Sequence, residues 1–154
     1  MVIKQFVAMK AFIFFGGKVL VLRESDKYTD GTNAGKYDVV GGRVKPGEQF
    51  EESLRREIKE ETGLSVSIGD PFYVGEWRPM VAGEHWQIIG TFFECVAETD
   101  EVKLGKDHDG YKWISPGEFD KLPVIESVKQ AFDKYLEMAE SGGCCGGGCC
   151  EGKC

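Results

Sequence analysis

The sequence has little positive charge, no long apolar run and few cysteines outside one segment. Lys and Arg total 19 against 26 Asp and Glu, which leaves a formal net charge of −7. This balance argues against a nucleic-acid polymer as the main partner. It does not exclude a small phosphorylated substrate, because divalent ions can screen the repulsion.

No segment has the roughly 20 consecutive apolar residues that a membrane-spanning helix needs. The stretch Met1–Leu22 is apolar but carries Lys4, Lys10 and Lys18, and it shows no small-residue cleavage site. We therefore expect a cytoplasmic protein with no membrane partner.

Cysteine is nearly absent from the body of the sequence. Cys95 stands alone in an apolar run, and the remaining cysteines lie between Cys144 and Cys154. With 154 residues the chain is long enough for one domain with its own core. We expect that domain over residues 1–140 and a Cys/Gly-rich tail over residues 141–154.

The tail has no apolar residue, apart from its cysteines, that could dock it on a core. Cys145 and Cys149 are separated by three residues, as are Cys150 and Cys154. The glycines between them would let thiolates surround one soft ion such as Zn²⁺. A free flexible tail and a disulfide clip are the alternatives, and a reducing cytoplasm disfavours the clip.

Apolar alternation and turn residues predict most of the secondary structure. Gly16-Gly17 is typical of a hairpin turn between two strands. Two long helices are expected, over residues 49–64 and 123–139. The second has a buried stripe of Val124, Val128, Ala131 or Phe132, Tyr135 and Met138. The expected strands cover residues 3–15, 18–23, 37–40, 65–68, 72–77, 85–98 and 111–115, with breaks at 69–71 and 78–84. This order predicts an α/β fold, an α/β/α sandwich with a mixed sheet.

The first long helix is amphipathic. Phe50, Leu54 and Ile58 recur every four residues, which predicts an apolar stripe packed on a core. Pro46-Gly47 fixes a turn before the helix, and Gly63 is placed to end it. The helix is therefore bracketed tightly by its flanking residues.

Three carboxylates share another face of this helix. Glu57, Glu60 and Glu61 stand at i, i+3 and i+4, so their like charges repel unless a cation neutralises them. Hard carboxylate oxygens are the ligands that Mg²⁺ or Mn²⁺ selects. The alternative is an ordinary solvated acidic face. Gly41-Gly42 favours the metal site, because glycine lets backbone carbonyls approach an ion or phosphate closely.

The pattern Gly42-x5-Glu48-x7-Arg56-Glu57-Ile58-x-Glu60-Glu61-x-Gly63-Leu64 resembles the signature box of the Nudix (MutT-like) hydrolases at every defined position. The resemblance implies that Glu57, Glu60 and Glu61 are metal ligands and that one of them could act as a base. It also implies that Glu48 and Arg56 hold the loop against the helix, and that the Gly41 carbonyl is a further ligand. Val40 stands where the family usually has Pro.

Further site residues are expected outside the box. The loop before the last strand resembles one that carries an additional acidic ligand in many family members, and Asp107 matches it best. A solvated loop acid is the alternative. Three basic residues flank the site and are candidates to bind phosphates: Arg23, Lys36 and Arg43. Four aromatic residues are candidates to stack on a nucleobase, with core packing as the alternative: Tyr28, Phe72, Trp77 and Trp86.

The resemblance implies a Mg²⁺-dependent (or Mn²⁺-dependent) hydrolase of a nucleoside triphosphate, an oxidised one included, that releases a nucleoside monophosphate and pyrophosphate. The spacing of Pro79 after the box is similar to that in ADP-ribose-hydrolysing members, so ADP-ribose is the alternative substrate. From other classes, a catalytically silent ligand-sensing domain and a thiolate metal-binding role of the tail stay open. Either a monomer or a homodimer is compatible with the sequence.

Overall fold

The computed structural model describes residues 1–29 and 31–142. The predicted Cys/Gly-rich tail, with its candidate Zn²⁺ site, lies outside the described residues apart from its first two positions. Within the described ranges, no helix is both long enough and apolar enough to cross a membrane.

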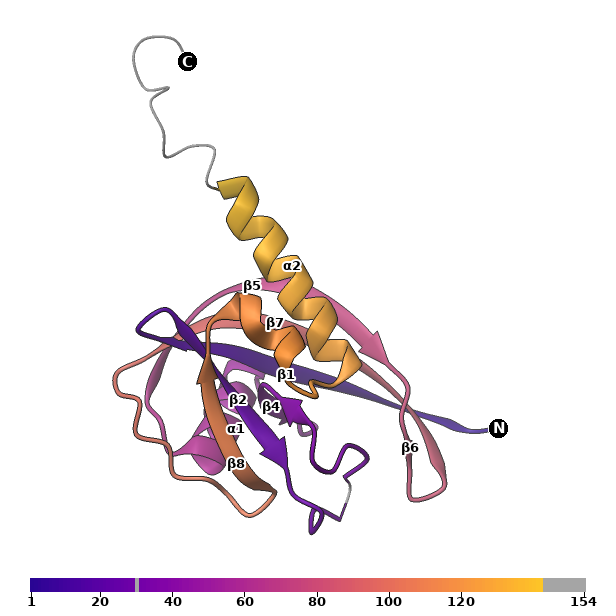
Figure 1. Ribbon diagram of the computed structural model, residues 1–154. Coiled ribbons are helices and arrows are strands. Elements are labelled where there is room, and N and C mark those ends of the chain that lie inside the picture. The colour runs from indigo at the N-terminus through magenta and orange to yellow at the C-terminus, as the bar shows by residue number, and fades with distance from the viewer. Residues whose placement is uncertain (30, 143–154) are drawn as a thin grey trace, which may run out of the picture.

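The described chain forms one mixed sheet with a long helix on each side (Figure 1). The sheet order is β3-β2-β1-β7-β5, with β4 paired to β1, β6 to β7 and β8 to β2. The strands are β1 Ile3–Phe15, β2 Lys18–Glu24, β3 Tyr37–Asp38, β4 Val40–Arg43, β5 Val66–Trp77, β6 Met80–Val81, β7 Glu84–Ala97 and β8 His108–Ile114. The helices are α1 Phe50–Thr62, the short 3₁₀ helix η1 Pro116–Lys121 and α2 Glu126–Gly142.

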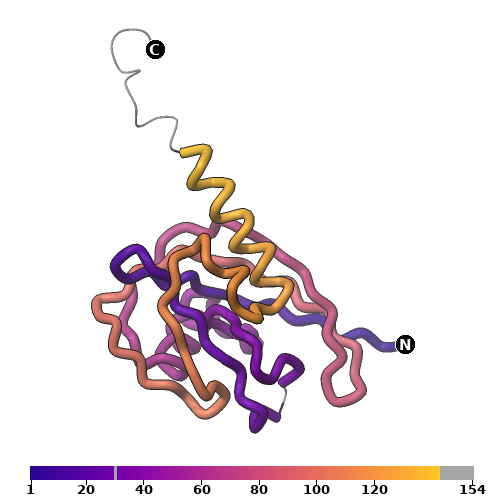
Figure 2. Tube along the Cα trace, viewed as in Figure 1, coloured from indigo at the N-terminus to yellow at the C-terminus, as the bar shows by residue number. Residues whose placement is uncertain are grey.

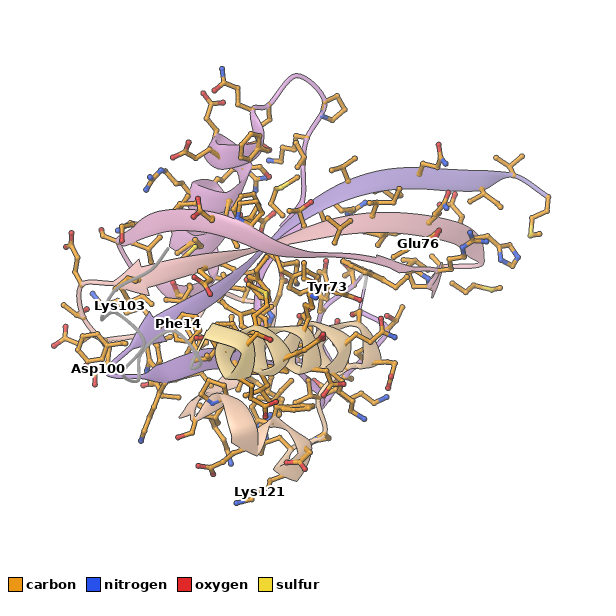
Figure 3. The ribbon with its side chains drawn as sticks, turned by 90° about the horizontal axis from the view of Figure 1, so that it is seen from above. Phe14, Tyr73, Glu76, Asp100, Lys103 and Lys121 are labelled. Atoms are coloured by element: carbon orange, nitrogen blue, oxygen red, sulfur yellow. The ribbon has the colours of Figure 1, made fainter. Side chains whose placement is uncertain are left out.

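The core lies in two layers, one on each face of the sheet. Successive β1 side chains point to opposite faces: Met9, Ala11 and Ile13 pack with α1, whereas Phe12 packs with α2. Seen from above, α1 and α2 lie on opposite sides of the strands (Figure 3). The predicted α/β/α sandwich is therefore confirmed.

Strand β1 organises the sheet because both of its edges are paired. It runs parallel to β7 from Ile3–His85 to Phe14–Val96. On its other edge it pairs antiparallel with β4, where Lys10 is opposite Gly41, and with β2. The N-terminal end of β1 and the β6–β7 hairpin thus lie side by side and project together from the body (Figure 2).

Two predicted breaks in the sheet are wrong. β5 continues through Gly69-Asp70-Pro71, because the strand keeps pairing with β7 and absorbs the interruption as register shifts on either side of Pro71. Pro71 is tolerated since β5 is the last strand of the sheet order. The segment expected as a loop at 78–84 contains β6, a tight hairpin with β7.

The second long helix starts later than predicted. Its expected first residues pair with β3 instead: the Tyr37 N–H donates to the Pro123 carbonyl at 2.9 Å, and the Ile125 N–H donates to the Tyr37 carbonyl at 3.0 Å. Val124 precedes the helix but is still buried in the core cluster that includes Val128 and Phe132. Met138, at 40% exposed, does not belong to the buried stripe.

Candidate active site

Helix α1 has the boundaries that its flanking residues dictate. The Gln49 N–H donates to Glu52 Oε2 at 3.4 Å at the start of the helix. Gly63 ends it at φ +69°, with its N–H bound to the Lys59 carbonyl. Leu54 and Ile58 are buried as expected, which fixes the rotation of the helix. The predicted stripe is wrong at Phe50, which is 53% exposed and stacks on Phe93 at the margin of the core.

The loop before α1 is clamped by a forked ion pair. Arg56 Nε donates to Glu48 Oε2 at 2.8 Å and Arg56 Nη2 donates to Glu48 Oε1 at 3.1 Å. The hydrogen bonds from Arg56, with one from the Lys45 N–H, lower the pKa of Glu48 to about 2. The hydrogen bonds to Glu48, together with the attraction of Glu57, raise the pKa of Arg56. The predicted contact between Glu48 and Arg56 is therefore present.

Gly41 and Gly42 form a cradle for two carboxylates. The Gly41 N–H donates to Glu61 Oε2 at 3.2 Å. A Cβ at Gly42 would lie 2.6 Å from Glu57 Oε1, so only glycine leaves room for that carboxylate. A Cβ at Gly41 would lie 2.2 Å from the Met9 carbonyl oxygen, and the Gly41 φ of +136° also favours glycine. Carboxylates of α1 therefore lie against both glycines, and the predicted approach of the glycine carbonyls to an ion or phosphate stays a prediction.

The three predicted ligand carboxylates line one cleft but do not converge on one point. Arg56 Nη1 lies between two of them, at 3.1 Å from Glu57 Oε1 and 3.3 Å from Glu60 Oε2. Glu57 is largely buried, whereas Glu60 is exposed. Across residues 1–29 and 31–142, no three acidic, His or Cys side chains lie close enough to surround an ion.

The donor chemistry nevertheless fits a hard divalent ion. Burial raises the pKa of Glu61 well above its usual range, Lys10 opposes this effect and Glu57 adds to it. A divalent cation would relieve both the burial cost and the repulsion. The glycine cradle and the oxygen-only donor set suit Mg²⁺ or Mn²⁺. The Gly41 carbonyl as a ligand stays a prediction.

The cleft around these carboxylates has a volume of about 1110 Å³. Asp107 lines it, and its carbonyl accepts the Ser25 N–H at 2.9 Å, which ties this loop to the end of β2. His108 also lines the cleft, and burial lowers the pKa of its imidazole. The role of Asp107 as a metal ligand stays a prediction.

Two of the three basic residues expected to bind phosphate line the cleft, and the third does not. Lys36 is exposed and lines the cleft. Arg43 also lines it, and its guanidinium lies 4.5 Å from the Trp86 ring centroid and 4.8 Å from that of Phe6. Arg23 lies outside the cleft and pairs with Asp109 at 2.6 Å. The expected contact of Arg23 with phosphate is therefore not favoured.

Three of the four aromatic residues expected to stack on a base line the cleft, and the fourth does not. Tyr28, Trp77 and Trp86 line the cleft. Phe72 does not; it packs with Phe12 in the layer under α2, so the core alternative holds for it.

Several residues of the cleft wall were missed by sequence reasoning, among them Phe6, Lys10 and Asp38. Lys10 Nζ lies 2.9 Å from Asp38 Oδ2, and the Lys10 side chain is only 7% exposed. One signal was available, because a lysine interrupts the apolar run of β1 at a position where a core residue would be expected. Asp38 gave no comparable signal, since it becomes the partner of Lys10 only through tertiary pairing.

The NUDIX domain model matches residues 4–135, which is most of the chain. The chain belongs to the NUDIX domain family, and the resemblance predicted from the box is confirmed. A nucleoside triphosphatase from Escherichia coli K12, NudI, is 34% identical over 93 residues. That match covers 56% of this chain and 66% of the relative, just under two thirds of its length.

Solved structures agree with the fold. A MutT protein from Methanosarcina mazei Go1 is 28% identical with a TM-score of 0.75, covering 88% of this chain and 96% of its own. An ADP-ribose pyrophosphatase from Streptococcus suis is 18% identical with a TM-score of 0.63, covering 89% and 91%. At that identity the second likeness concerns the fold alone.

Proposed function

We propose that this chain is a Mg²⁺-dependent or Mn²⁺-dependent hydrolase of nucleoside triphosphates. Water adds to a phosphorus of the substrate, a phosphoanhydride bond breaks, and a nucleoside monophosphate and pyrophosphate leave. The observation that carries the proposal is the complete box in its folded form, with Glu57 and Glu61 each held against one glycine in the cleft. The similarity to a nucleoside triphosphatase supports the substrate class.

The proposed roles of the residues are those that the resemblance to the family implies. Glu57, Glu60 and Glu61, with the Gly41 carbonyl and Asp107, would hold the ions. Bound divalent ions would neutralise charge on the phosphates and help to activate the attacking water. One of these carboxylates would accept the proton of that water.

Other residues of the cleft would bind and orient the substrate. Arg56 fixes Glu48 and Glu57, so the loop and the helix keep one geometry. Lys36 and Arg43 line the cleft and would bind phosphate oxygens. Trp77 and Trp86 line the cleft and would pack against a base.

ADP-ribose is the second candidate substrate, because Pro79 lines the cleft rather than lying elsewhere on the surface. Hydrolysis of ADP-ribose would give AMP and ribose 5-phosphate. The two proposals use the same carboxylates and differ only in what the far end of the cleft must accommodate.

A substrate panel tests the proposal. The full chain is assayed with ordinary and oxidised nucleoside triphosphates and with ADP-ribose, with and without Mg²⁺, and the products are identified by chromatography. Glu57→Gln should lower kcat by at least about 10²-fold, the lower range for a positioned acid or base. Glu51→Gln is the matched control, since Glu51 is on the same helix, exposed, and paired with Arg55 outside the cleft. Equal activity of wild type and Glu57→Gln would refute the proposed site.

A further inference from the structure

A buried ammonium group lies beside the carboxylates of the cleft. Lys10 is in the middle of β1 and is 6% exposed. Its Cα is the cross-strand partner of Gly41, the residue whose N–H donates to Glu61. Lys10 also lines the cleft itself. The charge is therefore placed behind the cradle of the carboxylates and not on the outer surface.

Stability alone does not account for this lysine. Lys10 is buried, whereas the side chain of Asp38 is 27% exposed. Burying the ammonium costs desolvation energy that the attraction to its partner often fails to offset, so an apolar residue at this position would serve the core at least as well. Asp38 accepts from Lys10 through Oδ2, while its Oδ1 has no hydrogen-bond partner in the described part of the chain. The pair is thus imperfect as a structural element.

The charge of Lys10 interacts with more than one carboxylate. Burial lowers the pKa of Lys10, but the attraction of Asp38, Glu61 and Glu57 outweighs it, so the net shift is upward. Glu61 and Glu57 are the two side chains seated against Gly41 and Gly42. One fixed positive charge therefore acts on both seated carboxylates at once.

We propose that Lys10 is a positioning residue of the carboxylate site. Its buried ammonium attracts Glu61 and Glu57 to the floor of the cleft before a divalent ion binds, and it moderates the affinity for that ion. The inference rests on the proposed function, because it concerns the same carboxylates.

Two effects of opposite sign follow from this role. Without the ammonium the site is more negative, so a divalent ion should bind more tightly. Without the ammonium the carboxylates are also less well placed, so turnover should fall. A residue that only supports the fold would weaken ion binding and turnover together.

The test measures Mn²⁺ binding and turnover separately. Free Mn²⁺ is titrated by electron paramagnetic resonance in the absence of substrate, and kcat is measured on the same preparations. For Lys10→Met we expect the Kd for Mn²⁺ to fall by about tenfold. That factor corresponds to removing the repulsion between one unit charge and a divalent ion when the screening is close to that of water. We expect kcat to fall by about tenfold or more. Lys4→Met is the matched control, because Lys4 is on the same strand, exposed and paired with Glu84; both quantities should stay unchanged.

Lys10→Met leaves Asp38, whose side chain is 27% exposed, without its ion-pair partner, and this can destabilise the fold. The double variant Lys10→Met/Asp38→Asn removes both charges and should fold. Because its net charge equals that of the wild type, its Kd for Mn²⁺ should return to within about threefold of the wild-type value. Its kcat should stay low, since the ammonium is still missing.

The outcomes separate this inference from the proposed function. Unchanged or weaker Mn²⁺ binding by folded Lys10→Met, or wild-type turnover by the double variant, would overturn the role of Lys10 alone. A wild-type chain that neither binds Mn²⁺ nor hydrolyses any nucleotide of the panel would overturn both. Tighter binding with lower turnover supports the role.

Discussion

Replacing Gly42 by alanine should disable the site while leaving the fold intact. The new Cβ would lie 2.6 Å from Glu57 Oε1 and 2.8 Å from its Cδ. Since unstrained contacts of this kind need roughly 3.5 Å, the carboxylate must withdraw by about 1 Å. A displacement of that size can cost about 10²-fold in rate, so we expect kcat to fall by about that factor. The melting temperature should change little, because the displaced group is the terminal carboxylate of a flexible side chain and not backbone.

Gly41→Ala is the informative counterpart. Its Cβ would meet backbone rather than a side chain, at 2.2 Å from the Met9 carbonyl oxygen and 2.8 Å from Lys10 Cα. The φ of +136° adds strain of about 1–3 kcal/mol for a residue other than glycine. A domain of this size loses roughly 2–4 °C in Tm per kcal/mol. We therefore expect the melting temperature to fall by several degrees or more.

Both variants are examined by calorimetry and by initial rates on the best substrate of the panel. Gly42→Ala should have lower activity at a nearly unchanged Tm. Gly41→Ala should show mainly a lower Tm. Full activity of Gly42→Ala would show that the position of Glu57 against the glycine does not matter for turnover. An unchanged Tm of Gly41→Ala would refute the argument from close backbone packing.

Three further predictions concern the same region. Arg56→Lys should lower kcat at least about tenfold, because Lys cannot make the fork to Glu48 and also reach Glu57; wild-type kinetics would contradict this. The pKa of Glu48 is about 2 in the fold against roughly 4.3 in an unfolded chain, so its contribution to stability is complete above pH ~4.3 and is lost as the pH falls towards 2. In Glu48→Gln the Tm should therefore fall less steeply between pH ~4.3 and 2 than in the wild type. An equally steep fall in both proteins would count against the ion pair of Glu48 with Arg56. Millimolar Mg²⁺ should raise the Tm of the wild type but not that of Glu61→Gln, as fluorimetric melting can check.

Turn and capping residues in the sequence predicted those parts of the fold that depend on a few neighbouring residues. The turn at Gly16-Gly17 has positive φ at both residues, as a tight hairpin needs. Gly63 ends α1 because its left-handed conformation suits a C-terminal cap. The pairing of Arg56 with Glu48 was also predictable, through the resemblance that places both residues in one box.

Pairing between distant segments was not predictable in the same way. Residues 123–125 form hydrogen bonds with Tyr37, and no pattern within either segment indicates this contact. The interior charge of Lys10 was visible in the sequence, but its meaning depended on the register that places it opposite Gly41. Phe50 was misassigned because helical periodicity gives the direction of a side chain and not what covers it.

The pairing of β1 has a consequence for the order in which the molecule assembles. Its contacts with β4 close a short loop of chain, from Lys10 to Gly41, whereas its contacts with β7 begin at Ile3 and His85. Non-local parallel pairing is slow, since loop-closure entropy is lost before the contacts form. During synthesis α1 leaves the ribosome before β7, the strand that pairs with β1 in the sheet beneath that helix. Hydrogen-exchange labelling during refolding should find the amides of β4 protected before those of the β1–β7 ladder.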